Sequence, residues 1–224
     1  MSISGQISEI FQSIQGEGPF LGNRQAFVRF YGCNLNCKFC DTRPSGFSQY
    51  SRLKVVQEIE RFPRPHSVSI TGGEPLLQIS FLKELFPYLK ERQHRIYLET
   101  NGTLVDELSS VIGLVDIVAM DFKLPSSTGG NSYFQEHEEF LKLARTREVF
   151  VKAVITDSTI SDDVETAVKI IKGIDRSIPL ILQPDTNCLS YGLFRNMANF
   201  RTLALEQLDN VRIVPQMHKL VGVK

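Results

Sequence analysis

The feature that most constrains the fold is an alternation of short apolar runs with longer segments of helical periodicity, starting near residue 67. The β-branched and apolar runs predict strands at Ser67–Thr71, Arg95–Glu99, Asp116–Met120, Glu148–Ile155, Leu180–Gln183 and Val211–Val214. Apolar residues spaced by three and four predict helices at Ile79–Glu91, Phe134–Arg145, Asp162–Ile174 and Tyr191–Leu208. This alternation predicts an α/β fold with a mostly parallel sheet, open or curled into a barrel, that binds ligands at the carboxyl ends of its strands.

Length and composition narrow the classes of protein. A chain of 224 residues with 42% hydrophobic composition predicts one domain, over residues 1–224. Its 25 basic and 25 acidic residues cancel, which argues against a nucleic-acid partner. Because no apolar run is long enough to cross a bilayer and the first residues lack a basic, apolar leader, we expect no membrane partner and a cytoplasmic location. The polar segment 125–132 predicts a surface loop.

A cluster of cysteines follows a predicted strand at Phe27–Tyr31, with Gly32 allowing a sharp turn between them. The cluster consists of Cys33, Cys37 and Cys40. A 4Fe–4S cluster ordinarily takes four thiolates, so three would leave one iron open to a ligand from outside the protein. The alternatives are a structural zinc completed by Cys188 or His218, or three buried thiols.

A second motif follows the strand at residues 67–71. Gly72 and Gly73 would let a ligand approach the backbone closely, and the Glu74 carboxylate could accept a hydrogen bond from an ammonium group. An ordinary strand-to-helix turn is the alternative.

Two further features indicate a polar ligand. Arg29 shares a strand face with Phe27 and Tyr31, so if that face looks inward, its guanidinium requires an anion. A ligand carboxylate or a protein Asp or Glu could supply that charge. The turn Gln15–Gly18 combines a carboxamide and a carboxylate with two glycines, which suits the edge of a flat heterocycle or an ordinary tight turn.

The cysteine spacing together with the Gly-Gly-Glu-Pro segment at residues 72–75 resembles the radical S-adenosylmethionine (SAM) superfamily. Segments 11–18, 40–42, 99–102 and 215–219 together resemble the 7-carboxy-7-deazaguanine synthase family, and this resemblance spans nearly the whole chain. It implies a partial, incomplete TIM-like β/α barrel of the radical SAM type that works as a homodimer.

The resemblance also implies cofactors and site residues. A 4Fe–4S cluster would sit on the three cysteines, with SAM in its fourth iron site, and Mg²⁺ would bind Thr42 beside the substrate. SAM would contact Gly72, Gly73, Glu74, Glu99, Asp121, Phe122 and Lys123. Where many relatives have Ser-Pro-Lys, this chain matches at Lys123 and departs at Asp121 and Phe122, and SAM contacts made through backbone atoms would survive that change. Substrate would contact Ile14, Gln15, Gly16, Glu17, Arg29 and Thr71. No catalytic residue is expected beyond these cofactor-holding and substrate-positioning groups.

The activity implied is conversion of the pterin 6-carboxy-5,6,7,8-tetrahydropterin to 7-carboxy-7-deazaguanine with loss of ammonia, in queuosine and 7-deazapurine biosynthesis. A flavodoxin-like or other one-electron reductant would be the partner. Two alternatives remain. A glycyl-radical activating enzyme would share the cysteine spacing but not the Gln15–Gly18 turn or Arg29, and a non-catalytic zinc-binding module would bind zinc instead of a cluster.

Overall fold

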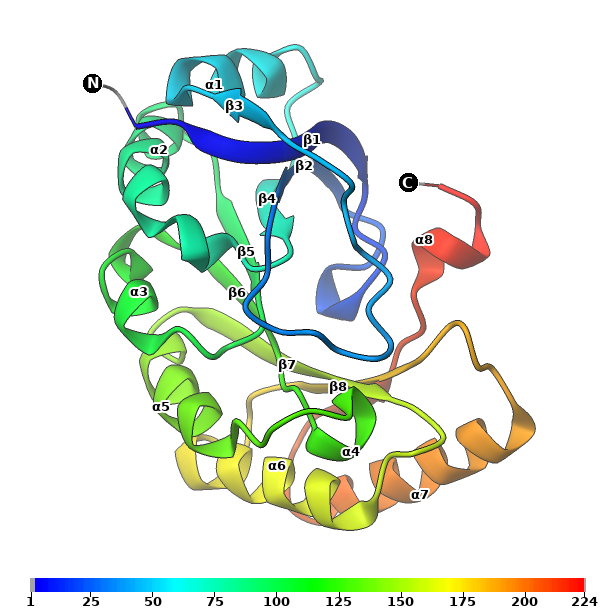
Figure 1. Cartoon of the computed structure of the whole chain (residues 1–224). Coiled ribbons are helices and arrows are strands. Elements are labelled where there is room, and N and C mark those ends of the chain that lie inside the picture. Colours follow the sequence, from blue (N-terminus) through cyan, green and yellow to red (C-terminus); the bar gives the residue numbers. More distant parts are fainter. Residues whose placement is uncertain (1–2, 224) are drawn as a thin grey trace.

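A nine-stranded sheet organises the protein, as the computed structural model of the chain describes it for residues 3–223 (Figure 1). The strands are β1 (Gly5–Ile14), β2 (Arg24–Phe30), β3 (Ser48–Tyr50), β4 (Ser67–Gly72), β5 (Ile96–Thr100), β6 (Ile117–Asp121), β7 (Glu148–Ile155), β8 (Leu180–Pro184) and β9 (Val211–Ile213). Their order is β3-β1-β2-β4-β5-β6-β7-β8-β9, and β2 and β4 to β9 run parallel, whereas β1 is antiparallel to β2 and β3. Because β3 and β9 do not pair, the sheet stays open, which confirms the predicted partial barrel.

Helices connect the parallel strands. The α-helices are α1 (Arg52–Glu60), α2 (Ile79–Glu91), α3 (Val105–Ser109), α4 (Pro125–Thr128), α5 (Phe134–Ala144), α6 (Ser161–Ile174), α7 (Tyr191–Leu205) and α8 (Met217–Leu220). The short 3₁₀ helices are η1 (Gly18–Phe20), η2 (Pro75–Gln78) and η3 (Ile112–Leu114). The longer helices cover the outside of the curved sheet, while the segment after β2 and helix α8 lie on its inner side (Figure 1). None of the helices within residues 3–223 has the length and apolar content needed to cross a bilayer.

The predicted strands and long helices are confirmed, with α2 spanning its predicted residues and α7 ending at Leu205. The prediction of a surface loop at 125–132 is wrong for its first half. Pro125 begins helix α4, and the Thr128 hydroxyl donates to the Leu124 carbonyl at 3.0 Å, which leaves Ser127 and Thr128 buried. Strand β1 was not predicted, because a bulge between Ile7 and Glu9 interrupts its alternation.

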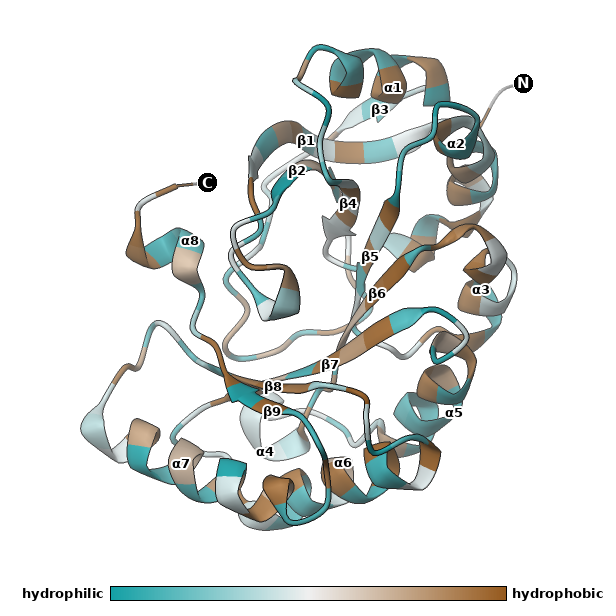
Figure 2. Ribbon diagram, turned by 180° about the vertical axis from the view of Figure 1, so that it is seen from behind, coloured by the Kyte–Doolittle hydropathy of each residue, from teal (hydrophilic) through white to brown (hydrophobic). Residues whose placement is uncertain are grey.

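The core has two parts, and their arrangement positions the ligand space. The larger part lies between the sheet and the outer helices, whose turns alternate between hydrophobic and hydrophilic residues (Figure 2). The smaller part fills the inner side of the sheet with Tyr97, Ile117, Ala119, Phe150 and Ile181. Phe20 of η1 packs on this cluster, with its ring centroid 5.6 Å from that of Tyr97. Tyr97, Ile117 and Ile181 belong to the first halves of their strands, so the interior is filled there, and the cavity lies toward the carboxyl ends.

Candidate active site

A cavity of about 230 Å³ opens at the carboxyl ends of the parallel strands. It brings together most of the residues predicted from the sequence, namely Ile14, Gln15, Gly16, Glu17, Arg29, Cys33, Cys37, Cys40, Thr42, Thr71, Gly72, Gly73, Glu99, Asp121 and Lys123. Glu74 and Phe122 do not line it. Phe122 is buried, and its ring stacks on His137 with centroids 4.6 Å apart. Any SAM contact from Phe122 would therefore run through its backbone.

The cysteine segment is held by the loop that follows β4. The Gly73 amide donates to the Phe30 carbonyl at 3.2 Å, and the Glu74 amide donates to the Gly32 carbonyl at 2.8 Å. A Cβ atom at Gly73 would lie 1.9 Å from the Gly32 oxygen, and Gly72 has a φ of +137°. The two glycines are therefore required by the close approach of two backbone segments, whatever ligand also binds there.

Two more loops hold the cysteine segment from the β5 and β6 sides. The Asn101 side chain donates to Asn34 at 2.8 Å, and the Asn34 amide in turn donates to the Thr103 hydroxyl at 2.9 Å. From the other side, the Lys38 amide donates to the Thr128 carbonyl at 3.1 Å. The segment therefore has an extensive scaffold although it forms neither helix nor strand.

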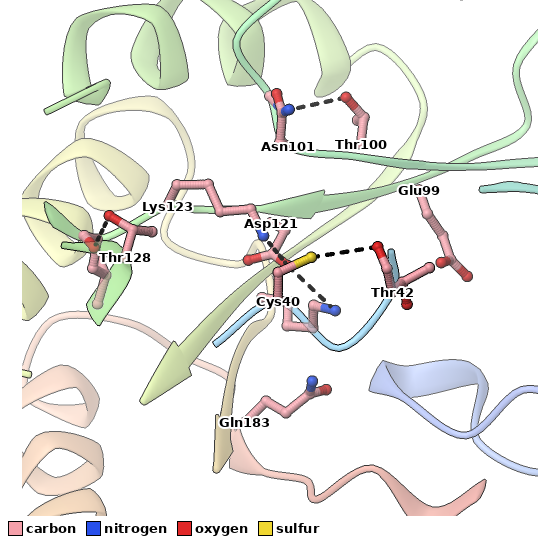
Figure 3. Close-up of polar contacts among 12 residues, drawn as sticks. Cys40, Thr42, Glu99, Thr100, Asn101, Asp121, Lys123, Thr128 and Gln183 are labelled. Carbon is pink, nitrogen blue, oxygen red and sulfur yellow. Dashed lines mark hydrogen bonds and ion pairs between the residues drawn. The ribbon is translucent and has the colours of Figure 1, made fainter. Parts of the chain in front are cut away.

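The three cysteines are all reduced and face the same cavity (Cys40 is shown in Figure 3). Burial raises the pKa of the Cys33 and Cys37 thiols, and the Lys123 ammonium acts in the opposite direction. Within residues 3–223, no three His, Cys, Asp or Glu side chains converge on one point as around a single metal ion. Cys188, proposed from the sequence as a zinc ligand, is exposed and does not line the cavity, whereas His218 does.

Glu74 is enclosed beneath the cavity wall. Its carboxylate accepts hydrogen bonds from the Leu76 amide at 3.1 Å, the Thr100 hydroxyl at 3.0 Å and the Asn101 amide at 2.7 Å. Burial raises its pKa to about 7 despite these bonds. In this arrangement, Glu74 joins the loops after β4 and β5 and does not present its carboxylate to a ligand.

Glu99 accepts hydrogen bonds from two of the predicted substrate residues. Its Oε1 atom accepts from Gln15 at 3.1 Å and from Ser69 at 3.0 Å, and its Oε2 atom accepts from Thr71 at 2.7 Å. Glu99 lines the cavity, and each of its carboxylate oxygens accepts at least one hydrogen bond from the protein. In this position Glu99 orients Gln15 and Thr71. The contact with SAM that the sequence predicted for Glu99 stays a prediction.

Arg29 lies on the inner face of β2, so the condition set in the sequence analysis is met, and it lines the cavity with Phe27. Its Nε atom donates to Glu9 at 2.7 Å, so a protein carboxylate supplies the anion in this structure. Its guanidinium also lies 5.6 Å from the centroid of the Phe11 ring. The anionic partner required by the sequence argument is therefore present, and it comes from strand β1.

Four charged side chains of alternating sign form a row along the cavity wall, which we call the charge row: Glu17, Lys152, Asp121 and Lys123. Lys152 Nζ lies 2.5 Å from Glu17 and 3.4 Å from Asp121, and Lys123 Nζ lies 2.8 Å from Asp121. Figure 3 shows Asp121 and Lys123 near Cys40. Burial acts to raise the pKa of Glu17, but the Lys152 ammonium and hydrogen bonds from Lys152 and Gln216 hold it below its ordinary value.

The C-terminal segment closes one side of the cavity. The Gln216 side chain donates to Glu17 at 2.8 Å and to Asp41 at 3.0 Å, and it accepts from Thr186 at 2.8 Å. Lys219 forms an ion pair with Asp41, next to the last clustered cysteine. Burial opposes ionisation of Asp41, but these partners bring its pKa to about 2.

Two buried acceptors on the wall have no hydrogen-bond partner within the described part of the chain. They are Asp121 Oδ1 and Gln183 Oε1, and both residues line the cavity. A buried acceptor without a partner is costly, so these atoms suit N–H or O–H donors of a bound ligand. The sequence patterns did not single out Gln183 or Lys152, and they included Gln216 only as part of the segment 215–219. For Lys152 a signal existed, because it is the charged residue within the apolar run 149–155 of β7.

An open α/β barrel with a three-cysteine segment after an early parallel strand defines a class of enzyme. The family model for the radical SAM superfamily matches residues 27–172. This superfamily is the class to which the fold and the site correspond. Within it, the chain belongs to the 7-carboxy-7-deazaguanine synthase family.

Two relatives support this assignment, and one solved structure supports the fold. The chain is 38% identical to 7-carboxy-7-deazaguanine synthase from Geobacter sulfurreducens, covering 97% of each chain. It is 37% identical to the enzyme of the same name from Methanopyrus kandleri, covering 96% of this chain and 92% of the relative. The crystal structure of QueE from Escherichia coli superposes with a TM-score of 0.69 at 22% identity, covering 96% of this chain and 95% of that one. This last likeness supports the fold.

Proposed function

We propose that this protein is a 7-carboxy-7-deazaguanine synthase, which converts 6-carboxy-5,6,7,8-tetrahydropterin to 7-carboxy-7-deazaguanine with loss of ammonia. One observation carries the proposal: three free cysteines share a cavity with a set of polar side chains. That set includes Arg29, Thr71 and the Gln15–Glu17 turn. We propose that residues 1–224 act as one catalytic domain.

The residues present fit a 4Fe–4S cluster and SAM. The donor set is three thiols, with Cys188 outside the cavity lining, so one iron would be left for SAM. Burial raises the pKa of the Cys33 and Cys37 thiols, and the Lys123 ammonium, 5.3 Å from the centroid of the Phe39 ring, opposes this rise and so favours their ligating form. When bound, the two cofactors supply a 5′-deoxyadenosyl radical for hydrogen abstraction.

The chain's own residues would bind and orient the substrate. Arg29 can offer guanidinium donors to the pterin carboxylate, in competition with or alongside Glu9. Thr71 and Gln15 are held by Glu99, so their remaining hydrogen-bonding groups have fixed directions. Because a primary carbon radical reacts with the group that lies nearest, this orientation decides which hydrogen is taken.

We also propose a Mg²⁺ site at Thr42. Thr42 lines the cavity, and its hydroxyl donates to the Asp41 carboxylate at 3.1 Å. A neutral hydroxyl is a weak ligand for a hard cation, so substrate oxygens and water would complete the shell. A homodimer, a flavodoxin-like or other one-electron reductant and a cytoplasmic location complete the proposal.

The test is anaerobic reconstitution followed by incubation with SAM, reductant, Mg²⁺ and the carboxytetrahydropterin. Mass spectrometry should detect 7-carboxy-7-deazaguanine, and elemental analysis should return about four irons per chain. Cys37→Ala should abolish both the cluster and the product. Its matched control, Cys188→Ala, should retain both. An intact cluster that cleaves SAM without forming this product would refute the substrate, and zinc in place of iron would refute the reaction class.

A further inference from the structure

Lys152 is the residue of the charge row to which neither the sequence motifs nor the proposed function gives a role. It lies on the inner face of β7 between Phe150 and Val154, both of which also line the cavity. Its side chain is only 18% exposed, and Glu17 and Asp121 are exposed to a similar small extent. A charge on this face therefore depends on its partners for compensation.

The two partners of Lys152 come from different parts of the chain. Glu17 belongs to the turn after β1, 135 positions away in sequence, and Asp121 ends β6. Asp121 has a second ion-pair partner, Lys123. Glu17 has one, because Lys152 is its cation in the ion pairs found within residues 3–223. Removing Lys152 would leave the Glu17 carboxylate with amide donors from Gln183 and Gln216.

Fold stability alone does not account for this arrangement. Replacing a buried ion pair by apolar residues of similar volume is often neutral or stabilising, because desolvation offsets the attraction. The neighbours of Lys152 on β7 show that this face accepts apolar side chains. Three charged groups held together here therefore indicate a requirement of the ligand site.

We propose that Lys152 is a positioning residue that holds the Glu17 carboxylate ionised and directed at the substrate space. Through its ion pair with Asp121, Lys152 also connects Glu17 to Lys123. This inference rests on the proposed function. An ionised carboxylate accepts hydrogen bonds only, so Glu17 would bind N–H groups of the heterocycle. Loss of Lys152 would let the substrate lie in several orientations while SAM cleavage continues.

The first experiment compares reconstituted wild-type enzyme with Lys152→Met and Lys152→Arg. We expect Lys152→Met to lose about 100-fold in product formation while still releasing 5′-deoxyadenosine, because misplacement of the substrate affects the step after radical formation. Lys152→Arg keeps the charge and should recover most of the product. The matched control, Lys169→Met, removes an exposed lysine of α6 and should behave as the wild type.

Two results would overturn the proposal. One is product formation by Lys152→Met within about threefold of the wild type. The other is an equal loss of SAM cleavage and product, which would place the effect on SAM or on the fold and not on substrate orientation.

A second experiment does not depend on the identity of the substrate. In a double-mutant cycle on the thermal unfolding of the reconstituted protein, Lys152→Met should lower the midpoint on the order of 10 °C, because it leaves Glu17 uncompensated. Adding Glu17→Gln should restore at least half of that loss. Additive effects would show that Lys152 does not hold Glu17. If the wild type makes no product but the cycle shows coupling, the proposed function fails while the pairing stands.

Discussion

At the scale of single residues, several side chains and glycines of the site shape its loops through contacts within the protein. Gly73 is needed because the loop after β4 touches the Gly32 carbonyl, and Glu74 is needed because it accepts backbone amides from two loops. His137 lies behind the same loops, where its Nε2 atom is 3.0 Å from the Asn101 carbonyl oxygen. Contacts within the protein, made by residues around the cysteine segment, therefore set the shape of that segment.

Gly73→Ala should destabilise the protein and reduce its iron content. The added Cβ would lie 1.9 Å from the Gly32 oxygen, so one of the two backbone segments must shift. We expect a loss of about 1–3 kcal/mol in the free energy of unfolding, measured by denaturant titration, and fewer irons per chain. Gly46→Ala is the control, because a Cβ there meets no atom within 4 Å. Equal stability of the two variants would contradict the argument.

His137 should make the stability of the protein fall in acid. Burial lowers its pKa from 6.5 to about 4, so the folded state holds the neutral ring where the unfolded chain would be protonated. The stabilisation is complete above pH 6.5 and is lost as the pH falls to about 4, a change of about 3 kcal/mol. His137→Gln should lack this component. Unfolding free energies of the two proteins at about pH 7, 5.5 and 4.5 test this, and parallel curves would contradict it.

At the scale of elements, loops at the carboxyl ends of the strands do more than connect them. The loops after β4, β5 and β6 grip the cysteine segment, and the segment that contains α8 reaches from β9 back to the turn after β1. A Cβ at Gly16 would lie 2.1 Å from His218 Nδ1, so α8 packs closely on that turn. Because β3 and β9 do not pair, α8 and the turn after β1 together cover the open side of the barrel.

Gln216→Ala should weaken substrate binding more than folding. The variant removes the side chain that links Glu17, Asp41 and Thr186, so the turn after β1 loses a hydrogen bond to a charged group. We expect KM for the pterin to rise about tenfold with a smaller change in kcat, measured by steady-state kinetics. Gln135→Ala on α5 is the control, since Gln135 is exposed and bonds only Glu139 among the described residues. An unchanged KM would show that the C-terminal segment does not shape the site.

At the scale of the whole molecule, an open barrel must fill its interior without a closing strand pair. The cluster around Tyr97 and Phe150 fills the interior below the cavity, and Phe20 covers it from the turn after β1. The buried hydrophobic residues of the covering helices pack with those of the sheet in one core cluster, and Figure 2 shows the hydrophobic stretches alternating with hydrophilic ones along these helices. The cavity therefore lies above this apolar cluster, where polar side chains line the interior of the barrel.

Phe20→Ala should lower the stability of the whole protein. The substitution removes a half-buried ring from the inner cluster, and we expect the free energy of unfolding to fall by about 2 kcal/mol, less than for a fully buried phenylalanine. Phe194→Ala removes a ring that is 43% exposed on α7 and should change stability by no more than about 0.5 kcal/mol. Equal losses in the two variants, measured by chemical denaturation, would mean that Phe20 does not close the interior.

Features that depend on neighbours along the chain could be predicted from the sequence. Periodicity indicated the parallel strands and the long helices, and covalent spacing indicated the three cysteines and the glycines after β4. Alternation of side chains along a strand also placed Arg29 on one face with Phe27, but only the structure decided that this face looks inward. The partial barrel, the family and the cofactors came from resemblance of whole motifs.

Which side chains meet across the cavity depended on the tertiary structure. Lys152 and Glu17 lie 135 positions apart, and Gln216 and Glu17 lie 199 apart, so sheet order and register bring them together. The structure also provided Arg29 with its partner on β1 and turned Glu74 away from the cavity. The physical reason is that hydrogen bonding and ion pairing act over a few ångströms in space, whereas local sequence patterns carry information about residues that are close together along the chain.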